Sequence, residues 1–258
     1  MGSIETIFLG IVQGLTEFLP VSSSGHLVIF QNYLGFREPE LLLDSALHLG
    51  TLAAVCVIFR TALLEIIKDG VRGNFRSPNG RMLVAIVAGT VPTALMGLLF
   101  EDLFEELFGS LSTVGVMLLV TGGVVSISHF IPKGHGTRIR VSIPAALAIG
   151  VAQGFAIIPG ISRSGTTIVC GLLCGLDRQL AARFSFLLSI PAILGALLTQ
   201  IHTDVLQRVG IIPLLAGFLS SAVIGILALM LLMRMVSKGH LAYFAPYCWV
   251  LGLWVLLG

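Results

Sequence analysis

The chain has 258 residues, of which 15 are basic and 13 acidic, so charged side chains make up 11% against roughly 25% in a typical soluble protein. Hydrophobic residues make up 56%, and the mean hydropathy is +1.01. This composition excludes a soluble enzyme, a disordered chain and a disulfide-rich secreted domain, and a net charge of +2 does not favour nucleic-acid binding. It predicts an all-α polytopic membrane protein, with one integral membrane domain over residues 1–258.

Six segments are apolar enough to cross a bilayer, which takes about 20 mainly apolar residues. In chain order they are residues 41–59, 82–100, 111–131, 184–201, 211–235 and 241–257. Two further apolar regions, 4–30 and 141–176, are each interrupted by a cluster of Gly, Pro and Ser. A broken backbone at membrane depth survives only where protein or water shields it. We therefore predict that both regions form re-entrant helical hairpins that line a cavity.

The charges of the connecting segments indicate the orientation of the six spans. Five basic and two acidic residues lie between Arg60 and Arg81, whereas segment 101–106 has four acidic residues and no basic one. Basic residues also dominate the segments that follow spans 111–131 and 211–235. Because basic loops stay in the cytoplasm, span 41–59 is predicted to run inward and both termini to lie outside.

The two interrupted regions repeat one another at an offset of 140 residues. Segment 10–25 reads GIVQGLTEFLPVSSSG and segment 150–165 reads GVAQGFAIIPGISRSG, with six identities in sixteen positions. The identical pairs are Gly10/Gly150, Gln13/Gln153, Gly14/Gly154, Ser22/Ser162, Ser24/Ser164 and Gly25/Gly165. An odd number of crossings separates the copies, which gives them opposite orientations. The sequence thus predicts an inverted-topology repeat, with repeat 1 at about 1–131 and repeat 2 at about 141–258, and a shared site near the midplane.

The two copies differ in the side chains that carry chemistry. The first holds Glu17, His26 and three consecutive serines, and the second holds Arg163 among serines and threonines. An ionisable group deep in a bilayer costs about 3 kcal/mol, so each is a functional candidate. The plain alternative is an ion pair between Glu17 and Arg163 that joins the two hairpins. It accounts for the two charges but not for the hydroxyl groups and the imidazole beside them.

Together these side chains are typical of a phosphate-handling site. Arg163 offers a planar set of donors that matches phosphate oxygens, and segment 160–165 begins a helix whose N-terminal dipole favours an anion. Glu17 can ligate a hard divalent cation or accept a proton, and Gln13 lies one helical turn before it. His26 follows Ser23 by three residues, so one helical turn can bring an imidazole to a hydroxyl, as nucleophilic catalysis requires.

Two motifs resemble those of the bacterial undecaprenyl-diphosphate phosphatases, also called bacitracin-resistance proteins. Segment 13–26, QGLTEFLPVSSSGH, is similar to their glutamate-rich motif, and segment 159–167, PGISRSGTT, to their signature PGxSRSxxT. The FSFLL run at 184–188 is similar as well. The resemblance implies an enzyme of the bacterial inner membrane that hydrolyses undecaprenyl diphosphate to undecaprenyl phosphate and inorganic phosphate, with a site open to the periplasm or cell exterior. Its product is the lipid carrier recycled for cell-wall synthesis.

The resemblance also implies roles for individual residues. The catalytic group would be Glu17, Ser23, His26 and Arg163, with Glu17 also binding Mg²⁺ or Ca²⁺. The substrate-binding group would be Gln13, Ser22, Ser24, Gly25, Gly160, Ser162, Ser164 and Thr167. Whether Ser23, His26 or neither forms a covalent intermediate is open, and our interpretation favours Ser23 with His26 as base. The implied partners are a polyprenyl diphosphate and membrane lipids. A homodimer is a hypothesis only, because the sequence does not fix the oligomeric state.

Four positions depart from this scheme or stand beside it. Gln13 stands where many family members carry glutamate, so Glu17 and substrate oxygens would hold the metal alone. Arg183 stands where glutamate is expected, and we interpret it as a topology anchor. Asp44 and His48, four residues apart in span 41–59, are interpreted as a structural pair, with proton transfer as the alternative.

A secondary transporter or a polyprenyl-phosphate flippase is the rival hypothesis, because such proteins also place broken helices of inverted repeats at the midplane. In that case Glu17 would couple cations or protons and Arg163 would bind an anionic substrate. The serine–histidine grouping favours chemistry, since a transport site has no need of a nucleophile. Release of phosphate in detergent, where there are no two compartments, separates the hypotheses.

Overall fold

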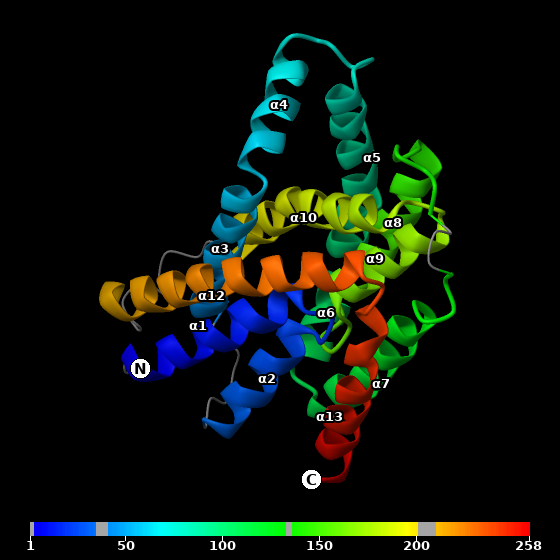
Figure 1. Ribbon diagram of the computed structural model, residues 1–258. Helices are drawn as coiled ribbons and strands as arrows, with labels where there is room; N and C mark the ends of the chain where they lie inside the picture. Colours follow the sequence, from blue (N-terminus) through cyan, green and yellow to red (C-terminus); the bar gives the residue numbers. More distant parts are fainter. Residues whose placement is uncertain (1–2, 35–40, 133–135, 201–209) are drawn as a thin grey trace.

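The computed structural model describes residues 3–34, 41–132, 136–200 and 210–258, and within these ranges its regular elements are helices (Figure 1). In chain order they are α1 (Ser3–Phe18), α2 (Ser23–Tyr33), α3 (Leu41–Ile58), α4 (Arg60–Val71), α5 (Pro78–Leu99), α6 (Glu101–Phe108), α7 (Leu111–Ile127), α8 (Ile143–Phe155), α9 (Arg163–Leu173), α10 (Arg178–Gln200), α12 (Ile211–Ser237), the 3₁₀ helix η2 (Leu241–Phe244) and α13 (Ala245–Leu257). The prediction of an all-helical protein is confirmed.

Several of these helices are suited to a bilayer. Helices α5, α10 and α12 are each long and apolar enough to cross one. Two bent pairs, α3 with α4 at 81° and α6 with α7 at 100°, pass the same test when each pair is taken together, which allows up to five spans. Helix α8 and the run from η2 to α13 are apolar but shorter. The chain is thus a multi-pass membrane protein.

The six predicted spans overlap α3, α5, α7, α10, α12 and α13, but six crossings are not confirmed, since between three and five spans pass the test of length and composition. Helix α10 begins several residues before position 184, and the predicted end of that span at 201 lies outside the described residues. Helix α13 begins only at Ala245, after the 3₁₀ turn η2. Pro246 in its first turn has no N–H to continue hydrogen bonding from the preceding segment, which explains the restart there.

One face of α12 illustrates why the helices suit lipid. Leu215, Leu219, Val223 and Leu227 recur every fourth residue and are between 55% and 59% exposed. A stripe of this kind is costly in water and favourable against acyl chains. The opposite face of α12 is buried and carries small residues, Gly217, Ser221 and Gly225, which allow close approach of α1 and α3.

Each interrupted region forms two helices with a short break, α1 and α2 in the first and α8 and α9 in the second. The two helices of each region pack against each other. The second helix starts with a serine cap in both cases: the Ser22 hydroxyl accepts from Gly25 N at 3.2 Å, and the Ser162 hydroxyl accepts from Gly165 N at 3.1 Å. The shared sequence SxSG therefore encodes the same helix start twice.

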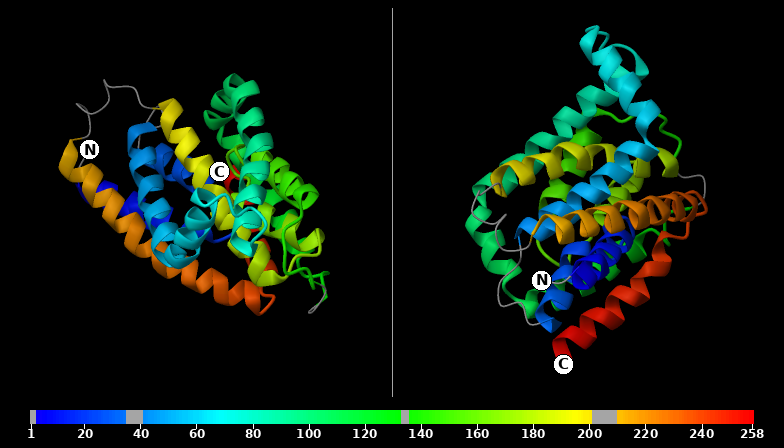
Figure 2. Two further views of the ribbon diagram at one scale, coloured as in Figure 1. Left: turned by 90° about the horizontal axis from the view of Figure 1, so that it is seen from above. Right: turned by 90° about the vertical axis from the view of Figure 1, so that its left-hand side faces the viewer.

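The first helix of each interrupted region packs on a helix from the other half of the chain. Helix α1 runs along α12, and α8 runs along α5 (Figures 1 and 2). At both contacts a glycine of the repeated sequence faces backbone. A Cβ on Gly10 would lie 2.6 Å from the carbonyl oxygen of Gly217, and a Cβ on Gly150 would lie 2.0 Å from that of Gly89. Only glycine permits these approaches, which explains why both copies keep it.

Gly150→Ala is therefore expected to lower the apparent melting temperature of the purified protein in detergent. The obstacle is the backbone of Gly89, which cannot rotate away as a side chain does, and overpacking of this kind costs about 1–3 kcal/mol. Gly123→Ala is the matched control, because nothing lies within 4 Å of a Cβ at that position. Equal melting temperatures for the two variants would contradict the close α5–α8 contact.

Candidate active site

The breaks of the two interrupted regions touch each other inside the protein. A Cβ on Gly25 would lie 3.2 Å from Cα of Gly160, and a Cβ on Gly165 would lie 3.0 Å from Cβ of Pro20. The Ser164 hydroxyl also donates to the carbonyl of Leu19 at 3.4 Å. Segments that are 140 residues apart in the sequence thus form one location, so side chains from both breaks can act on one ligand.

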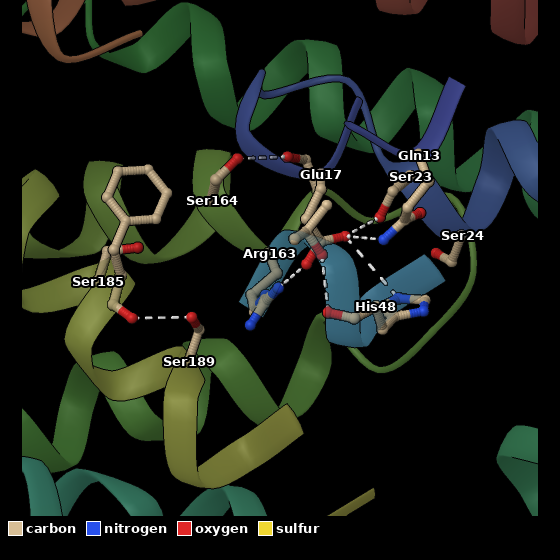
Figure 3. Close-up of polar contacts among 12 residues, drawn as sticks. Gln13, Glu17, Ser23, Ser24, His48, Arg163, Ser164, Ser185 and Ser189 are labelled. Carbon is tan, nitrogen blue, oxygen red and sulfur yellow. Dashed lines mark hydrogen bonds and ion pairs between the residues drawn. The ribbon is translucent and has the colours of Figure 1, made fainter. Parts of the chain in front are cut away.

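The carboxylate of Glu17, at the end of α1, is the centre of this location (Figure 3). Its Oε1 pairs with the guanidinium of Arg163, at the start of α9. Its Oε2 accepts from the Ser23 hydroxyl at 2.5 Å and from the Gln13 amide at 3.0 Å. The imidazole Nε2 of His48 lies 3.8 Å from the same oxygen. A cation and two hydrogen bonds thus compensate a carboxylate that is only 3% exposed.

Local structure explains how these groups reach Glu17. Gln13 precedes Glu17 by four residues on α1, so both side chains lie on one helical face. Ser23 is the first residue of α2, directly after the break. Arg163 occupies the matching position in the second copy, as the first residue of α9. Two equivalent helix starts therefore bring a hydroxyl and a guanidinium to one carboxylate.

The ion pair between Glu17 and Arg163, which the sequence analysis gave as a purely structural alternative, is present. It is not fully buried. The Arg163 side chain is 21% exposed and the His48 side chain 29% exposed, while Ser23 is half-buried. A positive charge, an imidazole and a hydroxyl therefore stay accessible around a buried carboxylate. Donors and a nucleophile in this arrangement suit an anionic ligand such as phosphate.

The imidazole of His26 contacts groups other than the Ser23 hydroxyl. Its Nδ1 lies 2.7 Å from the carbonyl oxygen of Ser22, and its Nε2 lies 2.7 Å from the hydroxyl of Tyr247. Both ring nitrogens are thus engaged, while the Ser23 hydroxyl binds Glu17 instead. The structure does not bring the imidazole of His26 to Ser23 as the spacing had suggested, and Glu17 takes the place next to the hydroxyl.

The hydroxyls predicted to bind substrate take part in the two breaks. The Ser22 and Ser24 hydroxyls lie 3.3 Å apart, and those of Ser162 and Ser164 are also 3.3 Å apart. Ser22, Ser162 and Ser164 are buried, whereas Ser24 is half-buried. These contacts shape both helix starts in the same way. Binding of phosphate by these serines stays a prediction.

Thr167 and Gly160 are held by residues outside the repeated motif. The Thr167 hydroxyl is fully buried and lies 2.5 Å from that of Ser185 on α10. Gly160 has a φ of 96°, and its carbonyl accepts from the Thr121 hydroxyl of α7 at 2.8 Å. Gly160 allows this left-handed backbone because it has no Cβ. Both residues fix the second break, and their contact with a substrate also stays a prediction.

Two side chains, those of His48 and Tyr247, make contacts at the site that the sequence does not predict. The spacing predicts a pair of side chains between His48 and Asp44. In the structure the Nδ1 of His48 lies 2.7 Å from the backbone carbonyl of Asp44, and its Nε2 faces Glu17. An ionisable group inside an apolar span was the available signal, and it applied to His48 as much as to Glu17. Tyr247 gave no signal, because 221 residues separate it from His26.

The donors beside Glu17 fit a hard cation only in part. Within the described ranges, no group of three or more His, Cys, Asp or Glu side chains is close enough to hold a metal ion. The amide oxygen of Gln13, however, is buried and has no hydrogen-bond partner. Oxygen atoms are the ligands that Mg²⁺ and Ca²⁺ prefer. The residues present therefore suit a cation that takes its remaining ligands from a bound diphosphate.

Comparisons with known proteins cover nearly the whole chain. The family described as bacitracin resistance protein BacA matches residues 6–254. The undecaprenyl-diphosphatase of Carboxydothermus hydrogenoformans is 44% identical over 262 residues, which cover 100% of this chain and 97% of the relative. That of Desulfatibacillum aliphaticivorans is 44% identical over 269 residues, with 98% of each chain covered. With both interrupted regions inside these matches, the chain belongs to the bacitracin resistance protein BacA family.

Proposed function

We infer that this protein is an undecaprenyl-diphosphatase, a membrane hydrolase that converts undecaprenyl diphosphate into undecaprenyl phosphate and inorganic phosphate. The family match and the names of relatives at 44% identity support this function. The observation that carries it chemically is the contact of Glu17 with both Arg163 and the Ser23 hydroxyl. The same comparisons do not favour a transporter or a flippase. The activity supplies the lipid carrier for cell-wall synthesis and accounts for bacitracin resistance.

Ser23 is the proposed nucleophile and Glu17 its base. The hydroxyl already donates to Glu17 Oε2 at 2.5 Å, so the carboxylate is placed to accept the proton as the oxygen attacks the terminal phosphorus. A Ser23 Oγ–P bond then forms, and the P–O bond to undecaprenyl phosphate breaks. Water subsequently cleaves the phosphoserine, which releases inorganic phosphate and restores the hydroxyl. Glu17 thereby takes the role that the spacing had favoured for His26.

Arg163 is the proposed clamp for the diphosphate. Its guanidinium has five N–H donors, of which the contact with Glu17 uses only part. The partly exposed remainder can donate to phosphate oxygens, and the positive charge offsets the negative charge that grows during phosphoryl transfer. His48, on the other side of Glu17, adds a second partly exposed nitrogen beside the carboxylate.

A divalent cation, Mg²⁺ or Ca²⁺, is the proposed cofactor. Glu17 and the unpartnered amide oxygen of Gln13 would hold it together with diphosphate oxygens. When bound, it would offset the repulsion between the diphosphate and the carboxylate. Binding of membrane lipids and of a second copy of the chain stays a prediction.

We also propose that the two interrupted regions re-enter the membrane as an inverted repeat, in a bacterial inner membrane with the site open to the periplasm or exterior. The reciprocal packing of α1 on α12 and α8 on α5, and the matching serine caps, support the repeat. The basic segment 60–81 supports the orientation.

Purified protein in detergent is expected to release phosphate from undecaprenyl diphosphate, because hydrolysis needs no second compartment. Chelation with EDTA is expected to reduce the rate strongly, and added Mg²⁺ or Ca²⁺ to restore it. Phosphate release is measured with a colorimetric assay against a protein-free control. A transporter or flippase would release none. Full activity in the presence of EDTA would contradict the cation.

Gln13→Glu sharpens this experiment. A second carboxylate one turn before Glu17 adds a negative ligand, so the cation concentration for half-maximal activity is expected to fall several-fold. Gln179→Glu is the matched control, since Gln179 is an exposed residue near the start of α10. Equal cation requirements for the two variants would place the cation elsewhere.

A further inference from the structure

The break that carries Ser23 contains a strained residue. Ser22 has a φ of 68° and a ψ of 99°, and it is the only non-glycine residue with positive φ in the described ranges. Such a backbone persists only where surrounding contacts hold it, and residues of this kind cluster at functional sites. Ser22 directly precedes the proposed nucleophile, so its conformation decides where the Ser23 hydroxyl points.

His26 holds the carbonyl of Ser22. The backbone N–H of His26 donates to this oxygen at 3.2 Å, and the ring Nδ1 lies 2.7 Å from it. Because a carbonyl oxygen only accepts, Nδ1 must carry a proton. In the neutral ring Nε2 is then an acceptor, and the Tyr247 hydroxyl donates to it at 2.7 Å. The tyrosine therefore fixes the orientation of the ring that holds Ser22.

Helix α13 supports the break from two adjacent residues. Tyr247 reaches His26, with the two rings nearly parallel at 4° and their centroids 5.7 Å apart. The thiol of Cys248 donates to the carbonyl of Pro20 at 3.5 Å. These contacts lie on either side of Ser22 in the sequence. The C-terminal helix thus holds both ends of the strained segment.

We propose that Tyr247 is a positioning residue for diphosphate hydrolysis: acting through His26, it keeps Ser22 in the conformation that directs the Ser23 hydroxyl at Glu17. This proposal rests on the proposed role of Ser23 as nucleophile. It gives His26 a function as the link between α13 and the break, rather than as the base. Removal of the phenol oxygen is then expected to slow the chemical step more than it weakens substrate binding.

The test is Tyr247→Phe, which removes one oxygen and keeps the ring. We expect kcat for undecaprenyl diphosphate to fall about tenfold, equivalent to about 1.4 kcal/mol, while KM and the melting temperature stay at wild-type values. Tyr243→Phe is the matched control. Tyr243 also stacks on a histidine, His240, at 4.8 Å and 10°, but it belongs to η2 and is expected to keep the wild-type kcat when changed.

A double variant tests whether Tyr247 acts through His26. In a His26→Gln background, which lacks the ring, Tyr247→Phe is expected to cause no further loss of kcat. Multiplying losses would overturn the proposal, because they would make the two residues independent. A wild-type kcat in Tyr247→Phe would overturn it too. A raised KM with unchanged kcat would also do so, since it would make Tyr247 a substrate contact.

Ser23→Ala, measured in parallel, separates this inference from the proposed function. If Ser23→Ala keeps the wild-type turnover, Ser23 is not the nucleophile, and the proposed positioning role of Tyr247 is refuted as well. If Ser23→Ala is inactive while Tyr247→Phe has a wild-type kcat, only the role of Tyr247 is wrong. An inactive Ser23→Ala with a tenfold loss in Tyr247→Phe supports both.

Discussion

Arg163→Ala is expected to abolish phosphate release, with a loss of about 10²–10³-fold or more, as for other groups that stabilise charge in a transition state. The guanidinium is both the partly exposed cation for the diphosphate and the partner of Glu17. Removing it takes away the clamp and leaves a buried carboxylate without its cation, which costs about 3–5 kcal/mol when such a pair is broken. The measurement is single-turnover phosphate release in detergent.

Arg163→Lys is a second variant that tests the role of the guanidinium even if Arg163→Ala does not fold. Lysine retains the positive charge beside Glu17 but not the planar set of donors, so we expect a folded protein with strongly reduced turnover. Arg183→Gln is the control, because Arg183 lies on α10 and is interpreted as a topology anchor rather than a catalytic group. Full activity in Arg163→Lys would refute the requirement for a bidentate clamp, and full activity in Arg163→Ala would refute the clamp altogether.

Ser23→Ala is expected to reduce turnover about 10³-fold or more, because it removes the proposed nucleophile. The wild-type protein, quenched with acid during turnover, should carry phosphate on Ser23 by mass spectrometry, and Ser23→Ala should carry none. Folding should be unaffected, since the half-buried hydroxyl has one described partner, Glu17.

Ser24→Ala is the matched comparison for this experiment. Ser24 is the next residue and is equally half-buried, but its hydroxyl lies near Ser22 rather than Glu17. As a predicted substrate contact, it is expected to lose no more than about tenfold, the value of a hydrogen bond. Similar losses in both serine variants, or phosphate on His26, would contradict the assignment of Ser23.

Much of this fold could be predicted because the spans of a membrane protein appear in its sequence as long apolar segments. Helix α12 appears as a long apolar run, and Pro20 and Pro159 mark breaks that the backbone cannot bridge with hydrogen bonds. The bends of 81° between α3 and α4 and of 100° between α6 and α7 were not predictable in this way. Hydropathy identifies apolar residues but does not show the direction in which the chain continues.

The site was predictable where the repeat constrained it. The pairing of Glu17 with Arg163 follows from two copies whose breaks meet. The contacts of His26 were not predictable. Spacing along α2 allows its ring to meet Ser23, but it does not show that the Ser23 hydroxyl donates to Glu17 or that the ring contacts the Ser22 carbonyl and Tyr247. Tyr247 was out of reach, since it contributes no periodicity or motif and meets His26 only through the packing of α13.

The exchange of partners between the halves has a consequence for biogenesis. Helix α1 leaves the ribosome long before α12, on which it packs, and Glu17 emerges well before Arg163. Until the later part is synthesised, the N-terminal segments bring an uncompensated acid into the insertion machinery. Contacts this remote in sequence form slowly. A ribosome stalled before residue 163 should therefore hold an assembly intermediate that depends on the translocon or an insertase for shelter, and that quality-control proteases degrade on release.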